Sequence, residues 1–279
     1  MNTFGFNINL RNTPEEILEL GDRCLADGSY GAIEVTYYED MQGVDTFAYN
    51  QAVRTIVDKY HPEVVVHISA FNTSEENSVL RSAIIHEFIN CCEYTKALGG
   101  RRIVMHSGRK QYSLHVPTVV TCADDQSGDP EYRRAWDLSV DLFRICCDIA
   151  REYGIIIFTE NLGPIHLTVR CSALTEFVRT VERDNLFIVF DIGHCHYTGG
   201  DIPEEVLECG KLLRHLHLHD NMGDKDSHLP VGEGNIDYRA FCEALEKVGY
   251  PGFYMMELNH CCPENLIRSR EKLLSCLEK

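Results

Sequence analysis

The stretch LFIVFDIGHCHYTGGDIPEEVLECGKLLRHLHLH, residues 186–219, contains one complete strand–helix–strand unit. LFIVFD (186–191) is an apolar run too short for a buried helix, and it is typical of a buried parallel strand. The acidic sequence Ile202-Pro203-Glu204-Glu205 marks the start of a helix, and HLHLH (215–219) is the next strand. This order predicts a parallel βαβ crossover.

The same unit recurs along the whole chain. We expect eight strands: FGFNI (4–8), AIEV (32–35), VVVHI (64–68), RIVMH (102–106), IIIFTE (155–160), LFIVFD (186–191), HLHLH (215–219) and FYMMEL (253–258). Amphipathic segments lie between them, including one that predicts a helix over 131–153 before Gly154. Eight units in 279 residues fit a single (β/α)8 TIM barrel domain covering 1–279. A doubly wound open sheet is the alternative, but the first strand is not followed by G-x-G-x-x-G.

The composition excludes several classes of protein. The 43 acidic and 26 basic residues give a formal charge of −17, which disfavours nucleic acid and membrane surfaces as partners. No stretch approaches the roughly 20 apolar residues of a membrane span, and the N-terminal sequence lacks a signal pattern, so we expect a cytoplasmic protein. The 13 cysteines are odd in number and form no C-x-x-C, which predicts buried thiols rather than disulfides.

One connection is unusually long for a barrel loop. Residues 107–130, SGRKQYSLHVPTVVTCADDQSGDP, separate the strand at 102–106 from the next helix, and loops of this length are usually lids or binding loops. We therefore expect a lid here.

Potential metal ligands stand at nearly every strand end, where a TIM barrel gathers its active site. They are Glu34, His67, His106, Glu160, Asp191, His194, His217, His219 and Glu257, and the loop after 215–219 adds Asp226 and His228. Taken singly, each is explained by ordinary hydrogen bonding or ion pairing at the barrel rim. Their coincidence favours a divalent-metal site, because buried carboxylates and imidazoles are costly unless paired or bound to a cation. The alternation in HLHLH puts its histidines on one face of the strand, which we expect to be the barrel interior.

Five motifs carry a family resemblance: FTEN (158–161), FDIGHCHYTGGD (190–201), HLHDN (217–221), DSHLPVGEGNIDY (226–238) and MMEL (255–258). They resemble the xylose-isomerase-like TIM-barrel superfamily, which contains sugar phosphate isomerases and epimerases and the endonuclease-IV-type AP endonucleases. The likeness spans His67 to Glu257, most of the chain.

The resemblance to the single-metal epimerases implies a ligand set and a mechanism. Glu160, Asp191, His217 and Glu257 would hold Mn²⁺ or Zn²⁺, with Co²⁺ or Mg²⁺ as alternatives. Glu160 and Glu257 would be the catalytic pair that removes and returns a carbon-bound proton through a metal-bound enediolate. The resemblance also implies that His194 binds the substrate oxygens. We expect His67, His106, Arg109 and His219 as further substrate-binding residues.

A nuclease is the main alternative. The repair enzymes share the same four positions and add five ligands for a trinuclear zinc site, and this chain has matching residues at His67, His106, His194, Asp226 and His228. Two departures disfavour it: small residues, Ser69-Ala70, stand where those enzymes place a DNA wedge, and HLHD replaces HLND. A dehydratase or lyase of the same barrel, and a catalytically silent binding barrel, also stay open.

The expected partner is a small-molecule sugar or sugar phosphate, with assembly into a homo-oligomer left open. Arg109, Lys110 and Lys225 are candidate contacts for an anionic substrate group, and solvated loop charge is the alternative for all three. Tyr112, His115 and His196 are expected to line the pocket.

Overall fold

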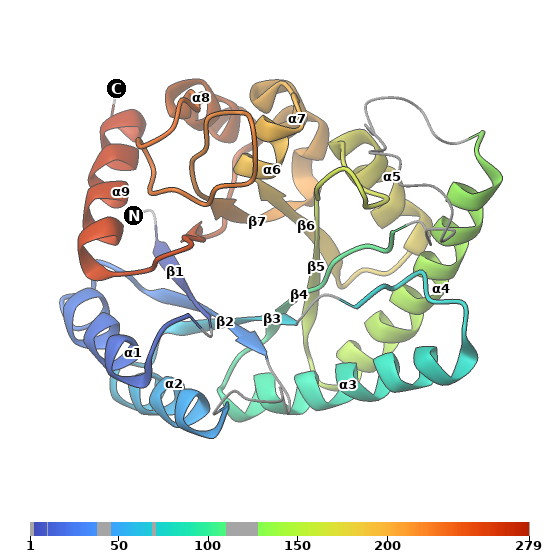
Figure 1. Cartoon of the computed structure of the whole chain (residues 1–279), viewed down its shortest axis with the longest axis horizontal. Coiled ribbons are helices and arrows are strands. Elements are labelled where there is room, and N and C mark those ends of the chain that lie inside the picture. The colour runs from blue at the N-terminus through green and yellow to red at the C-terminus, as the bar shows by residue number, and fades with distance from the viewer. Residues whose placement is uncertain (1–2, 10, 38–45, 69–70, 110–127, 279) are drawn as a thin grey trace.

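Eight parallel strands close into a barrel in the order β1-β2-β3-β4-β5-β6-β7-β8 in the computed structural model, which describes residues 3–9, 11–37, 46–68, 71–109 and 128–278. Helices surround the barrel on its outside (Figure 1). The predicted (β/α)8 fold is confirmed.

The strands are β1 (Phe4–Ile8), β2 (Ala32–Tyr37), β3 (Glu63–Ile68), β4 (Arg102–Val104), β5 (Ile156–Glu160), β6 (Leu186–Asp191), β7 (Leu213–Leu218) and β8 (Tyr254–Met256). The helices are α1 (Pro14–Leu20), η1 (Gly21–Leu25), α2 (Thr46–Tyr60), α3 (Ser78–Ala97), α4 (Pro130–Glu152), α5 (Cys171–Val181), α6 (Ile192–Tyr197), α7 (Ile202–Cys209), η2 (Gly210–Leu212), α8 (Tyr238–Val248) and α9 (Pro263–Leu277). The helix expected over 131–153 is α4. Within the described ranges, no helix is long and apolar enough to cross a membrane.

Two strands end earlier than the sequence pattern indicates. Pairing in β4 stops at Val104 and in β8 at Met256, so His106 and Glu257 lie just beyond the ladder. One more backbone hydrogen bond follows each strand, because Met105 and Glu257 donate their N–H groups to the carbonyls of Phe158 and Leu218. In contrast, β7 begins earlier than expected, at Leu213, where the pairing with β6 shifts in register between Ile188 and Val189.

The barrel interior is built in layers that position the site. One small cluster collects apolar residues from six strands, which only the interior can bring together: Ala32, Val65, Val104, Phe158, Val189 and Met255. Because side chains alternate along a strand, the residue two positions later points the same way. Those later residues are Glu34, His67, His106, Glu160, Asp191 and Glu257. The strand ends therefore present one polar layer above one apolar layer.

The histidines of β7 follow the same rule. His215 lies at the apolar layer, where its ring stacks on Phe158 with centroids 5.3 Å apart and planes 8° apart. His217 lies one layer higher, paired in register with Asp191. All three histidines of HLHLH are buried. The interior direction predicted from their alternation is confirmed.

The expected lid falls mostly outside the described residues. Of 107–130, the structure describes 107–109 and 128–130, so Lys110, Tyr112 and His115 lie outside it. The same holds for Ser69-Ala70.

Candidate metal centre

Four side chains meet at the centre of the barrel mouth: Glu160 at the end of β5, Asp191 at the end of β6, His217 in β7 and Glu257 after β8. One ligand atom of each lies within 4.8 Å of the others. The Nδ1 atom of His217 is 3.2 Å from Glu257 Oε2, 3.4 Å from Glu160 Oε1 and 3.9 Å from Asp191 Oδ2. One imidazole nitrogen therefore faces three carboxylates.

Two of these facing atoms lack a hydrogen bond. His217 Nδ1 and Glu160 Oε2 are buried and form none with any described residue. A buried polar atom without a partner costs free energy, and a cation between the carboxylates would satisfy both atoms. Carboxylate oxygens with one imidazole suit Mn²⁺, Zn²⁺, Co²⁺ or Mg²⁺. The residues present therefore fit a divalent metal.

The site is strongly charged. Burial raises the pKa of Glu160, but His217, His106 and His194 together hold it well below its usual range. Burial lowers the pKa of His217, but Glu257, Glu34 and Glu160 bring it well above the ordinary value. Glu160 is therefore ionised and needs positive charge beside it. A divalent cation or a protonated imidazole can supply that charge.

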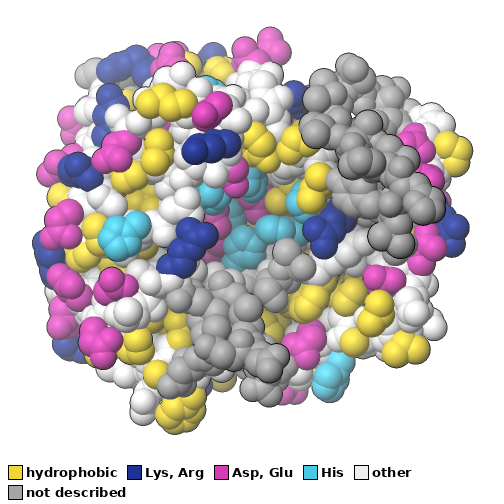
Figure 2. Space-filling model, viewed as in Figure 1, with side chains coloured by type: hydrophobic (Ala, Val, Ile, Leu, Met, Phe, Trp, Pro, Cys, Tyr) yellow, Lys and Arg dark blue, Asp and Glu magenta, His cyan; other side chains and the backbone are white. Residues whose placement is uncertain are grey.

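The other expected ligands form two neighbouring groups. His67 Nε2 and His106 Nε2 lie 2.9 Å apart, and His106 Nε2 is 3.4 Å from Glu160 Oε2. On the other side, Asp226 Oδ2 is 3.3 Å from His194 Nε2 and 3.1 Å from His228 Nε2. Figure 2 shows histidine and acidic side chains gathered in the hollow at the centre of this face. The structure thus brings together all nine residues named as metal ligands.

His219 lies behind Asp191. It is fully buried, and its Nε2 is 3.1 Å from Asp191 Oδ1 and 3.0 Å from Oδ2, so it holds that carboxylate in place. Its ring also stacks on His228, with centroids 3.7 Å apart. The substrate contact expected of His219 stays a prediction, and its position assigns it a supporting contact to Asp191.

Gly193 is required for this contact. A Cβ atom on Gly193 would lie 2.0 Å from Cε1 of His219, closer than any real contact. We expect Gly193→Ala to lower the free energy of unfolding by about 1–3 kcal/mol, the usual cost of overpacking a buried site. Urea unfolding measures this. Gly128→Ala is the control, because its Cβ would meet nothing within 4 Å. Equal stability of the two variants would contradict the close approach.

The remaining sequence candidates lie around this centre. His196 pairs with Asn221, and its Nδ1 lies 2.7 Å from Asn221 Oδ1. The backbone of Arg109 pairs with that of His166, and its N–H donates to Asn72 Oδ1 at 3.1 Å. Lys225 is exposed on the loop beside Asp226.

Glu34 was expected among the potential metal ligands at the strand ends, and in the structure it contacts three histidines. Two further polar residues at the site had no predicted role. His215 was recognised only as the first histidine of HLHLH. His166 follows β5 in an irregular loop without periodic signal, and its ring lies 6.1 Å from that of His106. Burial lowers the pKa of His166 to about 4, so its imidazole is neutral near pH 7.

The sequence agrees with this geometry. Residues 6–276 match the profile of the xylose isomerase-like TIM barrel family. The chain belongs to that family. The inosose isomerase of Bacillus subtilis is 30% identical over 196 residues, which cover 67% of this chain and 64% of that protein. An uncharacterised protein of Methanocaldococcus jannaschii is 29% identical over 227 residues, covering 79% of this chain and 72% of that one.

Solved structures share the fold of this chain. A D-tagatose 3-epimerase-like protein superposes with a TM-score of 0.74 at 24% identity, covering 100% of this chain and 97% of that one. The IOLI protein, solved with a binding zinc atom, gives a TM-score of 0.68 at 21% identity, covering 100% of this chain and 95% of that one.

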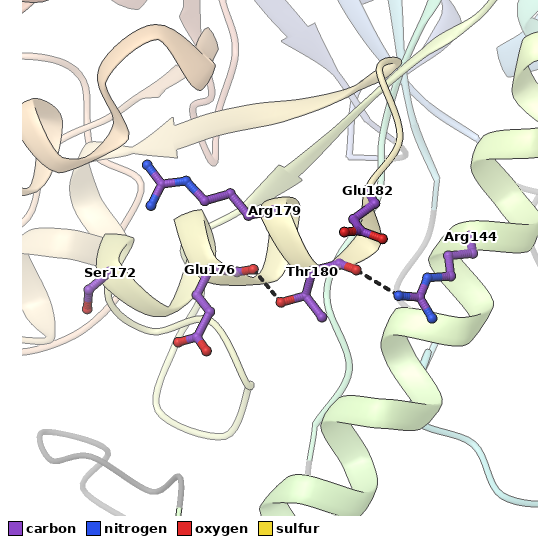
Figure 3. A pocket seen from close by; sticks show the side chains of 6 residues that line it. All are labelled: Arg144, Ser172, Glu176, Arg179, Thr180 and Glu182. Carbon is purple, nitrogen blue, oxygen red and sulfur yellow. Dashed lines mark hydrogen bonds between the residues drawn. The ribbon is translucent and has the colours of Figure 1, made fainter.

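A second hollow lies outside the barrel, between the helices α4 and α5. Arg144, Ser172, Glu176, Arg179, Thr180 and Glu182 line it (Figure 3). Arg144, from α4, donates to the carbonyl of Thr180 at 2.8 Å and so ties α4 to the end of α5. This hollow shares no residue with the metal-ligand groups, and its contacts hold helices together.

Proposed function

We propose that this chain is a divalent-metal-dependent isomerase or epimerase acting on a sugar or sugar phosphate. One observation carries the proposal: the carboxylates of Glu160 and Glu257 flank the unpartnered Nδ1 of His217. The names of its relatives support it, since they include inosose isomerases and D-psicose 3-epimerase.

Four residues would hold the ion: Glu160, Asp191, His217 and Glu257. Mn²⁺ and Zn²⁺ are the proposed metals, with Co²⁺ and Mg²⁺ as alternatives. A bound divalent cation polarises a carbonyl group and acidifies the adjacent C–H bond.

The carboxylates of Glu160 and Glu257 would perform the proton transfers. One removes the carbon-bound proton, and the other returns it to the resulting enediolate, which inverts the carbon or moves the carbonyl. The Glu160 side chain is 1% exposed and that of Glu257 is 16% exposed, so Glu257 is the group that meets solvent. His194 Nδ1 lies 3.0 Å from Glu160 Oε1, which orients that carboxylate.

Deuterium exchange tests the proposal. The metal-loaded protein would be incubated in D₂O with inosose and with ketohexoses, and NMR would follow the hydrogen beside the carbonyl. We expect its replacement by deuterium together with formation of the isomer or epimer. Conversion without deuterium uptake would contradict proton transfer through two carboxylates, and an absence of both would contradict the proposed function.

Arg109 bears on the choice between a neutral and a phosphorylated sugar. A charge-assisted hydrogen bond to a phosphate is worth about 1.5–3 kcal/mol, which corresponds to about 10-fold or more in KM. We expect Arg109→Gln to raise KM by that amount for a ketose phosphate and to leave KM unchanged for the neutral ketose. Steady-state kinetics with the matched pair measure this, and equal effects on both substrates would exclude a phosphate contact.

Hydrolysis of a phosphodiester is a second candidate function. The specific observation in its favour is that His67 and His106 gather with Glu160, while His194 and His228 gather with Asp226, as further ligand groups beside the first. Several clustered ions suit phosphodiester cleavage. Zinc-loaded protein would be tested on duplex DNA with an abasic site. Cleavage would favour this candidate, whereas intact DNA together with deuterium exchange on sugars would exclude it.

A further inference from the structure

Glu34 is a buried carboxylate that contacts three imidazoles. Its side chain is 1% exposed, and it lies in β2, whereas the four proposed ligands come from the other side of the barrel, β5 to β8. Its Oε1 is 3.1 Å from His67 Nδ1 and 3.0 Å from His217 Nε2, and its Oε2 is 2.9 Å from His215 Nε2. An ionised carboxylate only accepts hydrogen bonds, so each of these nitrogens carries a proton.

The two nitrogens of His217 therefore have different roles. Nε2 faces Glu34, and Nδ1 faces Glu160, Asp191 and Glu257. A histidine that binds a cation is neutral and has one N–H and one lone pair, so a proton held on Nε2 by Glu34 leaves the lone pair on Nδ1 for the metal. Glu34 and the three carboxylates lie on opposite sides of the ring, so a cation bound at Nδ1 lies away from Glu34.

His67 shows the same arrangement with its nitrogens exchanged. Nδ1 donates to Glu34, and Nε2 is left facing His106 Nε2 at 2.9 Å. One carboxylate thus sets the tautomers of two histidines that belong to neighbouring ligand groups.

We infer that Glu34 is a positioning residue that fixes the tautomer and ring orientation of His217 and His67, so that each presents a lone pair to the metal centre. The inference rests on the metal site of the proposed function and deepens it. Carboxylates that accept from the far nitrogen of a ligating histidine raise its basicity and hold its ring, and their loss typically costs about 10–100-fold in metal affinity.

His215 supports Glu34 from below. It is fully buried, stacked on Phe158, and its Nε2–H donates to Glu34 Oε2. Its other nitrogen, Nδ1, forms no hydrogen bond with a described residue. Glu34 is therefore its hydrogen-bond partner there, and the contact fills a third acceptor position of the carboxylate.

Glu34→Gln tests the inference without changing the size of the side chain. An amide has one oxygen and one NH₂ group, so it cannot accept hydrogen bonds from all three imidazoles. Its NH₂ group would face an imidazole N–H, and two donors cannot form a hydrogen bond. We expect the Kd for Co²⁺, measured by titration of the metal-free protein, to rise about 10–100-fold. We also expect the visible absorption of bound Co²⁺ to change, because the geometry of its histidine ligand changes.

Two control variants separate positioning from general damage. Val104→Ala disturbs the apolar layer that lies directly below the polar layer, and it removes no polar side chain. Glu63→Gln makes the same chemical change at a side chain that is 62% exposed and pairs with Arg102. Both are expected to bind Co²⁺ with wild-type affinity and absorption. Circular dichroism would verify the fold of every variant.

The results for these variants decide whether Glu34 positions the histidines. Wild-type Co²⁺ affinity in Glu34→Gln, or an equal loss in Val104→Ala, would overturn the positioning role. If Glu34→Gln does not fold, Glu34→Asp replaces it, since its shorter reach should weaken Co²⁺ binding, and unchanged binding would overturn the inference. A wild-type protein that binds no Co²⁺ would instead overturn the proposed metal centre, and the inference with it.

Discussion

Replacing Glu257 by Gln is expected to lower the rate of hydrogen exchange at the substrate carbon by about 10²–10⁴-fold, the usual contribution of a positioned acid or base. Glu257 is the more exposed of the two catalytic candidates, and its Oε2 is 3.2 Å from His217 Nδ1. An amide of the same shape keeps an oxygen near the metal but cannot take up a proton. The rate would be measured by NMR in D₂O.

The control for this variant must separate chemistry from metal loss. Because Glu257 is also a proposed ligand, exchange is measured at saturating metal, with occupancy determined in the same sample. Glu233→Gln makes the same change at an exposed carboxylate that pairs with Arg268. Wild-type exchange in the Glu257→Gln protein would remove Glu257 from its acid–base role.

His217→Gln is expected to reduce metal affinity by at least about 100-fold, the upper end of what the loss of an outer partner costs. The amide nitrogen of Gln replaces Nε2 and keeps the hydrogen bond to Glu34, but no atom replaces Nδ1 among the three carboxylates. A ligand present at 1,000 times its Kd stabilises a fold by about 4 kcal/mol. EDTA should therefore lower the Tm of the metal-loaded wild type and leave that of the variant unchanged.

An exposed histidine provides the matched comparison. His86 lies on α3 with an exposed side chain, so His86→Gln should bind metal and respond to EDTA as the wild type does. If His217→Gln retained wild-type affinity, Nδ1 of His217 would not be a ligand.

The sequence predicted those parts of the site that follow from the periodicity of single strands. Asp191 and Glu160 were predictable because each ends a short apolar run, and the fold brings such ends together. The partnership of Glu34 with His215 was not, because it joins residues 181 positions apart across the barrel and depends on the register of every strand between them. The role of Gly193 likewise appears only when the position of the His219 ring is known.

The ends of two strands could not be predicted from the sequence for a different physical reason. The apolar runs at 102–106 and 253–258 continue beyond the last paired residues, Val104 and Met256. At the barrel mouth, side chains stay buried for one or two residues after the strand pairing has ended. Apolar pattern reports burial, and it does not report where backbone hydrogen bonding ends. His106 and Glu257 are therefore placed on backbone just leaving the sheet, which aims them at the centre of the mouth.

The metal content of the purified protein is the most direct test of the proposed metal centre. We expect about one divalent ion per chain, Mn²⁺ or Zn²⁺, held by Glu160, Asp191, His217 and Glu257. Elemental analysis would measure it, and removal with EDTA should abolish hydrogen exchange until the ion is restored. Protein that neither contains nor takes up a divalent ion would contradict the proposed metal centre. About three zinc ions per chain would contradict a single-ion isomerase and favour the phosphodiesterase.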